Sequence, residues 1–382
     1  MKLRHLPVIA GILLLYSAIS AYIGWNGWLL LSTASNWTNP AAYTVIFAFL
    51  VFAYLLGRLG QSTAARPLAE PVKFIGAYWF AALEYGLLIL PVADLAGLIL
   101  YGSGVGKESA VLIPGTLAAI AMLCLLALGS RNAWSPIIRR FDVKLDKPSL
   151  EGKPFKPLRI AMASDIHLGT VVGKRHLRRL VDRVNQIKPD IILLPGDILD
   201  DDLAPFLHKN MAEELGKLSA PLGVYAVTGN HEYIGGKVPE FVEELSRIGI
   251  KVLMDESVEI DNRFIVIGRK DKAAEGRRST GRKSIAELIE PLDRSMPLIM
   301  LDHQPSDLIA ASENGIDLSL SGHTHRGQMM PNHLITRRVF PLDFGYRKFG
   351  QLHAIVSSGF GFWGPPIRIG SRSEVIHIEV RG

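Results

Sequence analysis

Hydrophobic residues are distributed very unevenly along this chain of 382 residues. Before residue 131 they form four long apolar segments, at residues 6–31, 41–59, 72–100 and 110–128. Each segment is close to or above the roughly 20 residues that a helix needs to cross the apolar core of a bilayer. The pattern therefore predicts an all-α domain of four transmembrane helices over residues 1–130.

The pattern changes after residue 157, where short apolar runs alternate with amphipathic stretches, as is typical of βα units. Residues 174–187 carry Leu177, Leu180 and Val184 at helical spacing and predict a helix. The expected strands are residues 158–164, 191–194, 223–227, 264–267, 298–301, 318–320, 354–357 and 375–380. We therefore predict an α/β domain over residues 158–382, joined to the membrane domain by a basic linker at residues 131–157.

The basic residues near the apolar segments predict an orientation. The loop at residues 32–40 has no charge, whereas basic residues lie before the first segment, between the second and third, and after the fourth (Lys2, Arg4, Arg58, Arg66, Lys73, Arg131, Arg139, Arg140, Lys144, Lys147). Because such residues favour the cytoplasmic side, we expect a multi-pass protein of the inner (plasma) membrane with both termini and the α/β domain in the cytoplasm.

Two of the apolar segments allow a second interpretation. Lys2, Arg4 and the small residues at 17–21 also resemble a cleavable signal peptide, although the apolar run continues to Leu31, which favours an anchor. The third segment contains Glu84 and Asp94. Carboxylates inside a membrane are costly, so these two indicate either helix packing around a water-accessible interior or a contact with a lipid headgroup or an ion.

The composition argues against several classes of site and partner. Cys124 is the one cysteine, which excludes a disulfide within the chain and argues against a thiolate metal site. The net charge of +6 is largely explained by basic residues at membrane edges, and no aromatic-basic pattern points to nucleic acid. We therefore expect no nucleic-acid partner.

Polar side chains follow the apolar runs of the second domain at five places. They are Asp165 and His167, Asp197 and Asp200, Asn230 and His231, His303, and His323 and His325. Carboxylates, imidazoles and a carboxamide are the ligands of two-metal hydrolytic sites. This oxygen and nitrogen set suits Mn²⁺, Fe or Zn²⁺. The other histidines have no such neighbours and are interpreted as structural or exposed (His5, His176, His208, His333, His353, His377).

The order of these motifs, Asp-x-His, Gly-Asp-x-x-Asp, Gly-Asn-His-Glu, His and Gly-His-x-His, resembles the signature of the calcineurin-like metallophosphoesterases over residues 158–380. The Gly-His-Thr-His-Arg-Gly-Gln run and the Ser358-Gly-Phe-Gly sequence resemble the membrane-associated bacterial branch, which includes lipid-linked phosphodiesterases. The resemblance implies a sandwich of two β-sheets flanked by helices. It also implies two divalent metal ions, and we favour manganese as the metal.

The resemblance assigns a role to each matching position. One metal ion would be held by Asp165, His167, Asp197 and His325, and the other by Asp197, Asn230, His303 and His323. His231 would contact the substrate phosphate or protonate the leaving oxygen, with Asp200 orienting its ring. Arg326 stands where many relatives have glycine, and its guanidinium either binds the substrate phosphate or points to solvent.

The predicted reaction is hydrolysis of a phosphodiester or pyrophosphate bond by a hydroxide that bridges the metals. A membrane domain that holds this site near an anionic leaflet favours a lipid-linked or nucleotide substrate, such as a nucleotide-linked lipid whose pyrophosphate is cleaved. One alternative is a phosphodiesterase or phosphatase that acts on soluble nucleotides or proteins. Another is a non-catalytic membrane receptor or transport component that binds metal. The predicted pairing of His231 with Asp200 argues against this alternative, because a purely structural metal site needs no acid.

Overall fold

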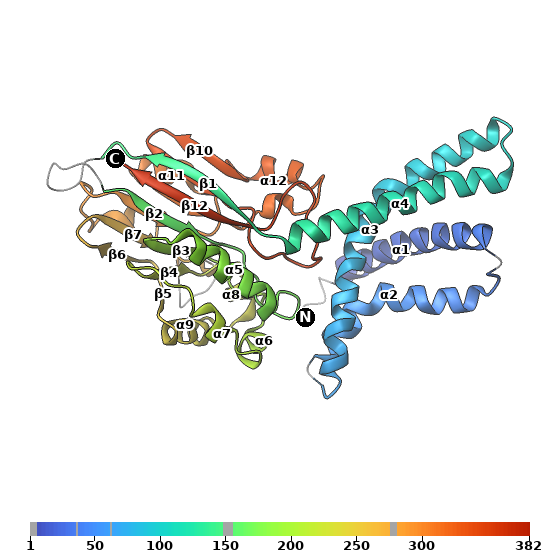
Figure 1. The fold of residues 1–382 in the computed structure, drawn as a ribbon, viewed down its shortest axis with the longest axis horizontal. Coiled ribbons are helices and arrows are strands. Elements are labelled where there is room, and N and C mark those ends of the chain that lie inside the picture. The colour runs from blue at the N-terminus through green and yellow to red at the C-terminus, as the bar shows by residue number, and fades with distance from the viewer. Residues whose placement is uncertain (1–5, 36, 62, 148–155, 276–280) are drawn as a thin grey trace. The chain divides into compact units, whose positions relative to one another are not determined.

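The computed structural model describes residues 6–35, 37–61, 63–147, 156–275 and 281–382. Lys2, Arg4, His5 and residues 148–155 of the predicted linker lie outside the described residues. The chain divides into two compact units, one of residues 1–130 with 364–367 and one of residues 131–363 with 368–382. We call them the helical unit and the α/β unit, and Figure 1 shows their elements.

The helical unit contains helices that correspond to the four apolar segments. They are α1 (Leu6–Ala34), α2 (Pro40–Gly60), α3 (Arg66–Gly102) and α4 (Lys107–Trp134), whose last residues belong to the α/β unit. Within the described residues, all four are long and apolar enough to cross a membrane. Helices α2 and α3 approach closely at Gly76, where a Cβ atom would overlap the backbone of Tyr54.

The α/β unit is built around two sheets, each with six strands in the described part of the chain. The first has the order β1 (Ile137–Lys144), β12 (Glu374–Arg381), β2 (Leu158–Met162), β3 (Ile191–Pro195), β4 (Val224–Val227), β5 (Ile250–Val252). The second has the order β10 (Gly345–Phe349), β11 (Leu352–Val356), β9 (Leu318–Ser321), β8 (Leu298–Leu301), β7 (Phe264–Gly268), β6 (Glu256–Ile260). Strands β2 to β5 run parallel to one another, as do β7, β8, β9 and β11.

Helices cover the outer faces of the two sheets, and this explains why the central strands are continuously apolar. Ile160 of β2 and Ile299 of β8 share the core between the sheets, whereas Ala161 packs outward with Leu177. Both faces of each central strand are therefore buried, and alternate residues supply different cores. The helices are α5 (Lys174–Ile187), α6 (Leu203–His208), α7 (Met211–Leu215), α8 (Asn230–Gly235), α9 (Val238–Arg247), η2 (Lys272–Ala274), α10 (Ile285–Ile289), α11 (Leu308–Glu313), η3 (His325–Gly327) and α12 (His333–Val339).

The predicted α/β fold of two sheets flanked by helices, preceded by four apolar helices, is confirmed. The interpretation of residues 131–157 as a linker is wrong for residues 137–144, which form β1. That strand pairs in parallel with β12, and the Nε atom of Arg139 lies 2.8 Å from Oε2 of the buried Glu374. Arg139, one of the basic residues that were interpreted as marking a membrane edge, therefore lies on an edge strand of the first sheet.

Candidate metal centre

The predicted ligand residues all follow strands, either in a loop or, for Asn230 and His325, at the first residue of a short helix. Asp165, Asp197 and Asn230 come after β2, β3 and β4, and His303 and His323 come after β8 and β9. Because neighbouring strands in each set are parallel, their carboxyl ends lie at one edge of the sheet. Residues from five loops are thus brought together at the corresponding edges of the two sheets.

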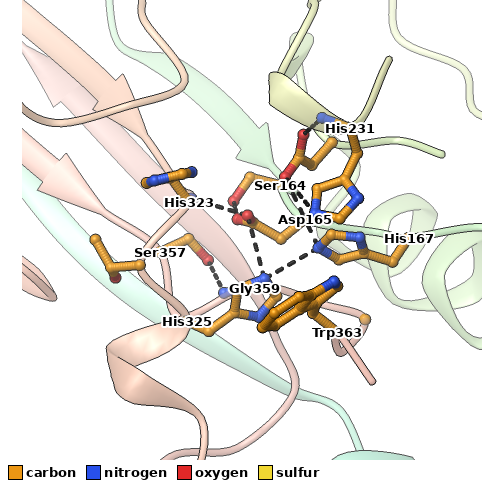
Figure 2. A network of polar contacts seen from close by, with 12 residues as sticks. Ser164, Asp165, His167, His231, His323, His325, Ser357, Gly359 and Trp363 are labelled. Atoms are coloured by element: carbon orange, nitrogen blue, oxygen red, sulfur yellow. Dashed lines mark hydrogen bonds and ion pairs between the residues drawn. The ribbon is translucent and has the colours of Figure 1, made fainter. Parts of the chain in front are cut away.

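The first donor group consists of Asp165, His167 and His325. Their ligand atoms all lie within 4.8 Å of one another. The Nε2 atoms of the two imidazoles are 3.0 Å apart, and His325 Nε2 is 3.5 Å from Asp165 Oδ1. All three side chains are buried, and Figure 2 shows the two rings facing each other beside the carboxylate. Two imidazoles and a carboxylate turned toward one point are a donor set that can bind a cation.

The second donor group consists of Asp197, His303 and His323, with Asn230 beside them. Ligand atoms of the first three lie within 4.8 Å of one another, and His303 Nε2 is 3.1 Å from Asp197 Oδ2. The Oδ1 atom of Asn230 is 2.8 Å from His323 Nδ1 and 3.3 Å from His303 Nε2. Asp197 Oδ2 is also 3.9 Å from Nε2 of His167, so this carboxylate lies between the two groups.

The backbone of the site is strained at the ligand residues themselves. Asp165, His167, Asp197, His323 and His325 all have φ between 49° and 71°, a left-handed region that residues other than glycine seldom adopt. Tertiary contacts maintain this conformation: Asp165 donates its N–H to the carbonyl of Gly196, and its Oδ1 accepts the N–H of His323 at 2.8 Å. Backbone strain of this kind concentrates at functional sites.

The electrostatics of the site fit a divalent cation. Burial lowers the pKa of His167 to about 3 and that of His323 to about 4, so both rings keep a free lone pair at neutral pH. Burial opposes protonation of His303 as well, but the carboxylate of Asp197 outweighs it and raises the pKa of His303 well above 6.5, so a metal ion bound there would displace the proton of this ring. His303 donates Nδ1–H to the carbonyl of Pro195 at 2.8 Å, the type of contact that orients a metal-binding histidine.

His231 lies against this site and pairs with a carboxylate. Its Nδ1 atom is 2.7 Å from Oδ1 of Asp201. Asp200, the predicted partner, also lies close, because ligand atoms of Asp200, His231 and His167 are all within 4.8 Å of one another. The orienting role of Asp200 stays a prediction, and Asp201 makes the hydrogen bond in this structure. The chain turns at Asp201, which has a φ of 58°, and the backbone N–H of Asp200 donates to the carbonyl of Leu168. Burial opposes the charge on His231, but the hydrogen bond to Asp201 and the carboxylate of Asp197 raise its pKa to about 9.

Comparison with known proteins agrees with this geometry. Residues 158–327 match the family model described as calcineurin-like phosphoesterase. An uncharacterized metallophosphoesterase of Campylobacter jejuni is 30% identical over 350 residues, which cover 88% of this chain and 91% of that protein. The chain belongs to the calcineurin-like metallophosphoesterases. It is thus a metal-dependent phosphoester hydrolase, and its family uses divalent metal ions.

Two further relatives differ in how much of this metallophosphoesterase they match. A transmembrane protein with metallophosphoesterase domain from Danio rerio is 30% identical over 328 residues, which cover 80% of this chain and 74% of that protein. An uncharacterized metallophosphoesterase of Aquifex aeolicus is 34% identical, over 59% of this chain and 85% of that protein. Together with the four long apolar helices, the transmembrane relative indicates a membrane protein.

Two buried residues of this metallophosphoesterase support the site and had no predicted role. Glu232 accepts the backbone N–H groups of Gly229 (2.6 Å), Leu199 (2.9 Å) and Asp197 (3.2 Å), and so ties the loop after β3 to the start of α8. Its side chain reaches back to the N–H of Gly229, three residues earlier, which is the contact that the glutamate of a capping box makes. Arg368 is fully buried, with Nη2 3.2 Å from His325 Nδ1, and no motif marks it.

Arg326 also lies beside the centre of this metallophosphoesterase. Its guanidinium carbon is 4.6 Å from the centre of the Phe344 ring, a cation–π distance. The backbone of Arg326 is left-handed, with a φ of 52°. When the guanidinium plane stacks on Phe344, its N–H groups still point outward from the edge of that plane. The predicted contact with a substrate phosphate stays a prediction.

Proposed function

We propose that this chain is a membrane-anchored, dinuclear metallophosphoesterase that hydrolyses a phosphodiester or pyrophosphate bond in a lipid-linked substrate. The observation that carries the proposal is the position of Asp197. Its Oδ2 atom lies 3.1 Å from His303 and 3.9 Å from His167, between two donor groups, and 4.0 Å from Nε2 of His231. A carboxylate so placed can bridge two cations beside an acid.

Each donor group would hold one metal ion. Asp165, His167 and His325 would hold the first, and Asn230, His303 and His323 the second, with Asp197 shared by both. Divalent ions bound there would activate a water molecule and offset the charge of the phosphoryl group. Oxygen and imidazole donors suit Mn²⁺, Fe and Zn²⁺, and we favour Mn²⁺.

His231 would act as the acid. Its raised pKa, about 9, means that it carries a proton at neutral pH. Asp201 accepts the Nδ1–H and fixes the ring, which leaves the Nε2–H to donate to a phosphoryl oxygen or to the leaving oxygen. This arrangement supports a catalytic function over a purely structural metal site, which needs no proton donor at that position.

The four apolar helices support the membrane part of the proposal. Lysine and arginine residues at the ends of the spans favour an orientation in which the helices cross the plasma membrane and the α/β unit lies in the cytoplasm. An anionic leaflet would then lie near the site, where a lipid-linked substrate is at high local concentration. A fusion of alkaline phosphatase to the C-terminus should stay inactive and a fusion of green fluorescent protein should fluoresce; the opposite pair of results would reverse the orientation.

The reaction is tested on full-length protein in detergent with Mn²⁺ and bis-p-nitrophenyl phosphate. We expect turnover by the wild type and none by Asp197→Ala, while Asp261→Ala, which removes an exposed carboxylate, keeps full activity. If the wild type binds two metal ions but hydrolyses no phosphoester of a broad panel, the chain is a metal-binding receptor and the proposal fails.

The substrate is tested separately, on a membrane-lipid extract. The full-length protein should release a product that mass spectrometry identifies as the headgroup phosphate of a lipid, and Asp197→Ala should release none. Faster turnover of soluble nucleotides than of every lipid in the extract would leave the reaction class intact and refute the lipid preference.

A further inference from the structure

The short helix α12 carries an unusual share of the exposed apolar surface of the α/β unit. Among its described residues, exposed large apolar side chains number nine, and four of them lie within ten residues: Met330, Leu334, Ile335 and Val339. Single exposed apolar residues are common on soluble proteins, but clusters mark interaction sites. No residue of α12 is buried.

The exposed residues of α12 combine apolar and basic character. Ile335 and Val339 are four residues apart and so neighbours on the helix surface, as are Leu334 and Arg338. Arg337 is also exposed, and no carboxylate in the described part of the chain forms an ion pair with either arginine. We call Leu334, Ile335, Arg337, Arg338 and Val339 the α12 patch.

The α12 patch is fixed next to the metal centre. Thr336, on the inner side of the helix, donates its hydroxyl to Oδ2 of Asp343 at 2.9 Å. The ring of Phe340, directly after the helix, lies 5.7 Å from that of His323, edge to face. Trp363, another exposed apolar side chain, lies with its ring 6.3 Å from that of His231 (Figure 2). The helix is therefore held by its polar and aromatic contacts, and its apolar residues remain outside.

We propose that the α12 patch docks on an anionic phospholipid leaflet. Leu334, Ile335 and Val339 would enter the boundary between headgroups and acyl chains, while the two arginines pair with lipid phosphates. The two arginines complement an anionic surface. A leaflet is favoured over an acidic protein because helices α1 to α4 tether the chain to a bilayer and so keep the leaflet at high effective concentration. The proposal concerns a surface outside the metal centre and does not rest on the substrate being a lipid.

The experiment places a reporter on the patch in the full-length protein. Cys124 is replaced by serine, and Ile335→Cys is labelled with an environment-sensitive fluorophore after reconstitution into nanodiscs. Lipids with a nitroxide at a shallow acyl position act as the quencher. The matched control is Ile309→Cys on α11, which is 57% exposed against 63% for Ile335 and lies outside the patch.

We expect quenching at position 335 to exceed that at position 309 about threefold or more in discs containing phosphatidylglycerol. It should fall to the level of position 309 in discs of phosphatidylcholine alone, and in the anionic discs when Arg337→Glu and Arg338→Glu are combined. Equal quenching at both positions overturns the proposal, as does quenching at 335 that ignores lipid charge.

Folding is checked by turnover of bis-p-nitrophenyl phosphate in detergent, which the arginine variants should retain. If they lose it, the comparison of anionic with neutral discs, made with the arginines intact, decides the outcome. Because the quenching readout needs no turnover, an inactive wild type would count against the proposed function without affecting this test.

Discussion

Exposed side chains differ in kind between the two units. In the described part of the helical unit, large apolar residues such as Leu14, Val45 and Leu98 are exposed, whereas Ile160 and Ile299 in the α/β unit are completely buried. Helices satisfy their own backbone hydrogen bonds, so apolar side chains can face lipid without cost. The α/β unit must instead remove its apolar surface from water, and it does so by placing each central strand between two cores.

Polar side chains follow the same division. Contacts between membrane helices include the hydroxyl of Tyr22, which donates to Asp94, and Trp79 Nε1, which donates to the hydroxyl of Tyr16 at 3.0 Å. In the α/β unit, buried carboxylates such as Glu232 and Glu374 each accept several hydrogen bonds. Losing one polar partner should therefore lower stability far more in the α/β unit than among the helices.

Outside the proposed metal ligands, the largest effect is expected at Glu232. Glu232→Ala would release three backbone N–H groups, among them that of the proposed bridging residue Asp197, and we expect activity to fall about 10- to 100-fold. Kinetics on bis-p-nitrophenyl phosphate with graded Mn²⁺ would measure it. The matched control is Glu287→Ala, which removes the glutamate of an exposed capping box on α10 and should leave the rate within about twofold. Equal losses in the two variants would contradict a positioning role for Glu232.

The ion pair between Arg139 and Glu374 is expected to have the next largest effect. Glu374 is fully buried, so Arg139→Ala should lower the free energy of unfolding of the α/β unit by about 2 kcal/mol, less than for a wholly buried pair because Arg139 is partly exposed. Thermal unfolding followed by near-ultraviolet circular dichroism would measure it. Arg140→Ala, at the exposed neighbour on β1, should change stability by less than about 0.5 kcal/mol. An equal effect of both variants would show that β1 contributes through its backbone alone.

The same division between the two units decides which elements could be predicted from the sequence. Apolar runs predicted the four helices and the central strands because burial or lipid contact requires apolar residues over a whole element. Strand β1 was missed because its exposed basic residues hide its pairing with β12. Strands β5, β6 and β10 were missed as well, since β5 has three residues and the others are largely exposed edge strands.

Within the site, the sequence named residues but not their geometry. Motifs marked Asp165, Asp197 and Asn230 because ligand chemistry demands those residue types at the ends of strands. The resemblance assigned the orienting role to Asp200, whereas the left-handed turn at Asp201 brings the next carboxylate within hydrogen-bond distance of His231. Arg368 could not be found, because its contact with His325 spans 43 residues and depends on the complete fold.

A smaller and pH-dependent effect is expected at His176, on the buried side of α5. Burial lowers its pKa to about 3, and its ring packs 4.5 Å from that of Phe360. Because the unfolded chain binds this proton near pH 6.5 and the folded chain does not, stability is retained above pH 6.5 and lost as the pH falls toward 3. His176→Phe should therefore remove about 1–2 kcal/mol of the destabilisation between pH 7 and pH 5. Unfolding midpoints at both pH values would measure it, and His208→Phe, at an exposed position, should leave the difference unchanged.

The smallest effect is expected in the helical unit, at the contact between α1 and α3. Tyr22→Phe removes the hydroxyl that donates to Asp94, and hydrogen bonds between membrane helices contribute about 0.6 kcal/mol on average because the unfolded state in the membrane finds other partners. Unfolding by sodium dodecyl sulfate in mixed micelles would measure the loss, with Tyr101→Phe, an exposed tyrosine of α3, as the control. A loss above about 2 kcal/mol would exceed the largest such contribution. It would then follow that Asp94 is desolvated as fully as Glu374, and that buried charge in this chain is not confined to the α/β unit.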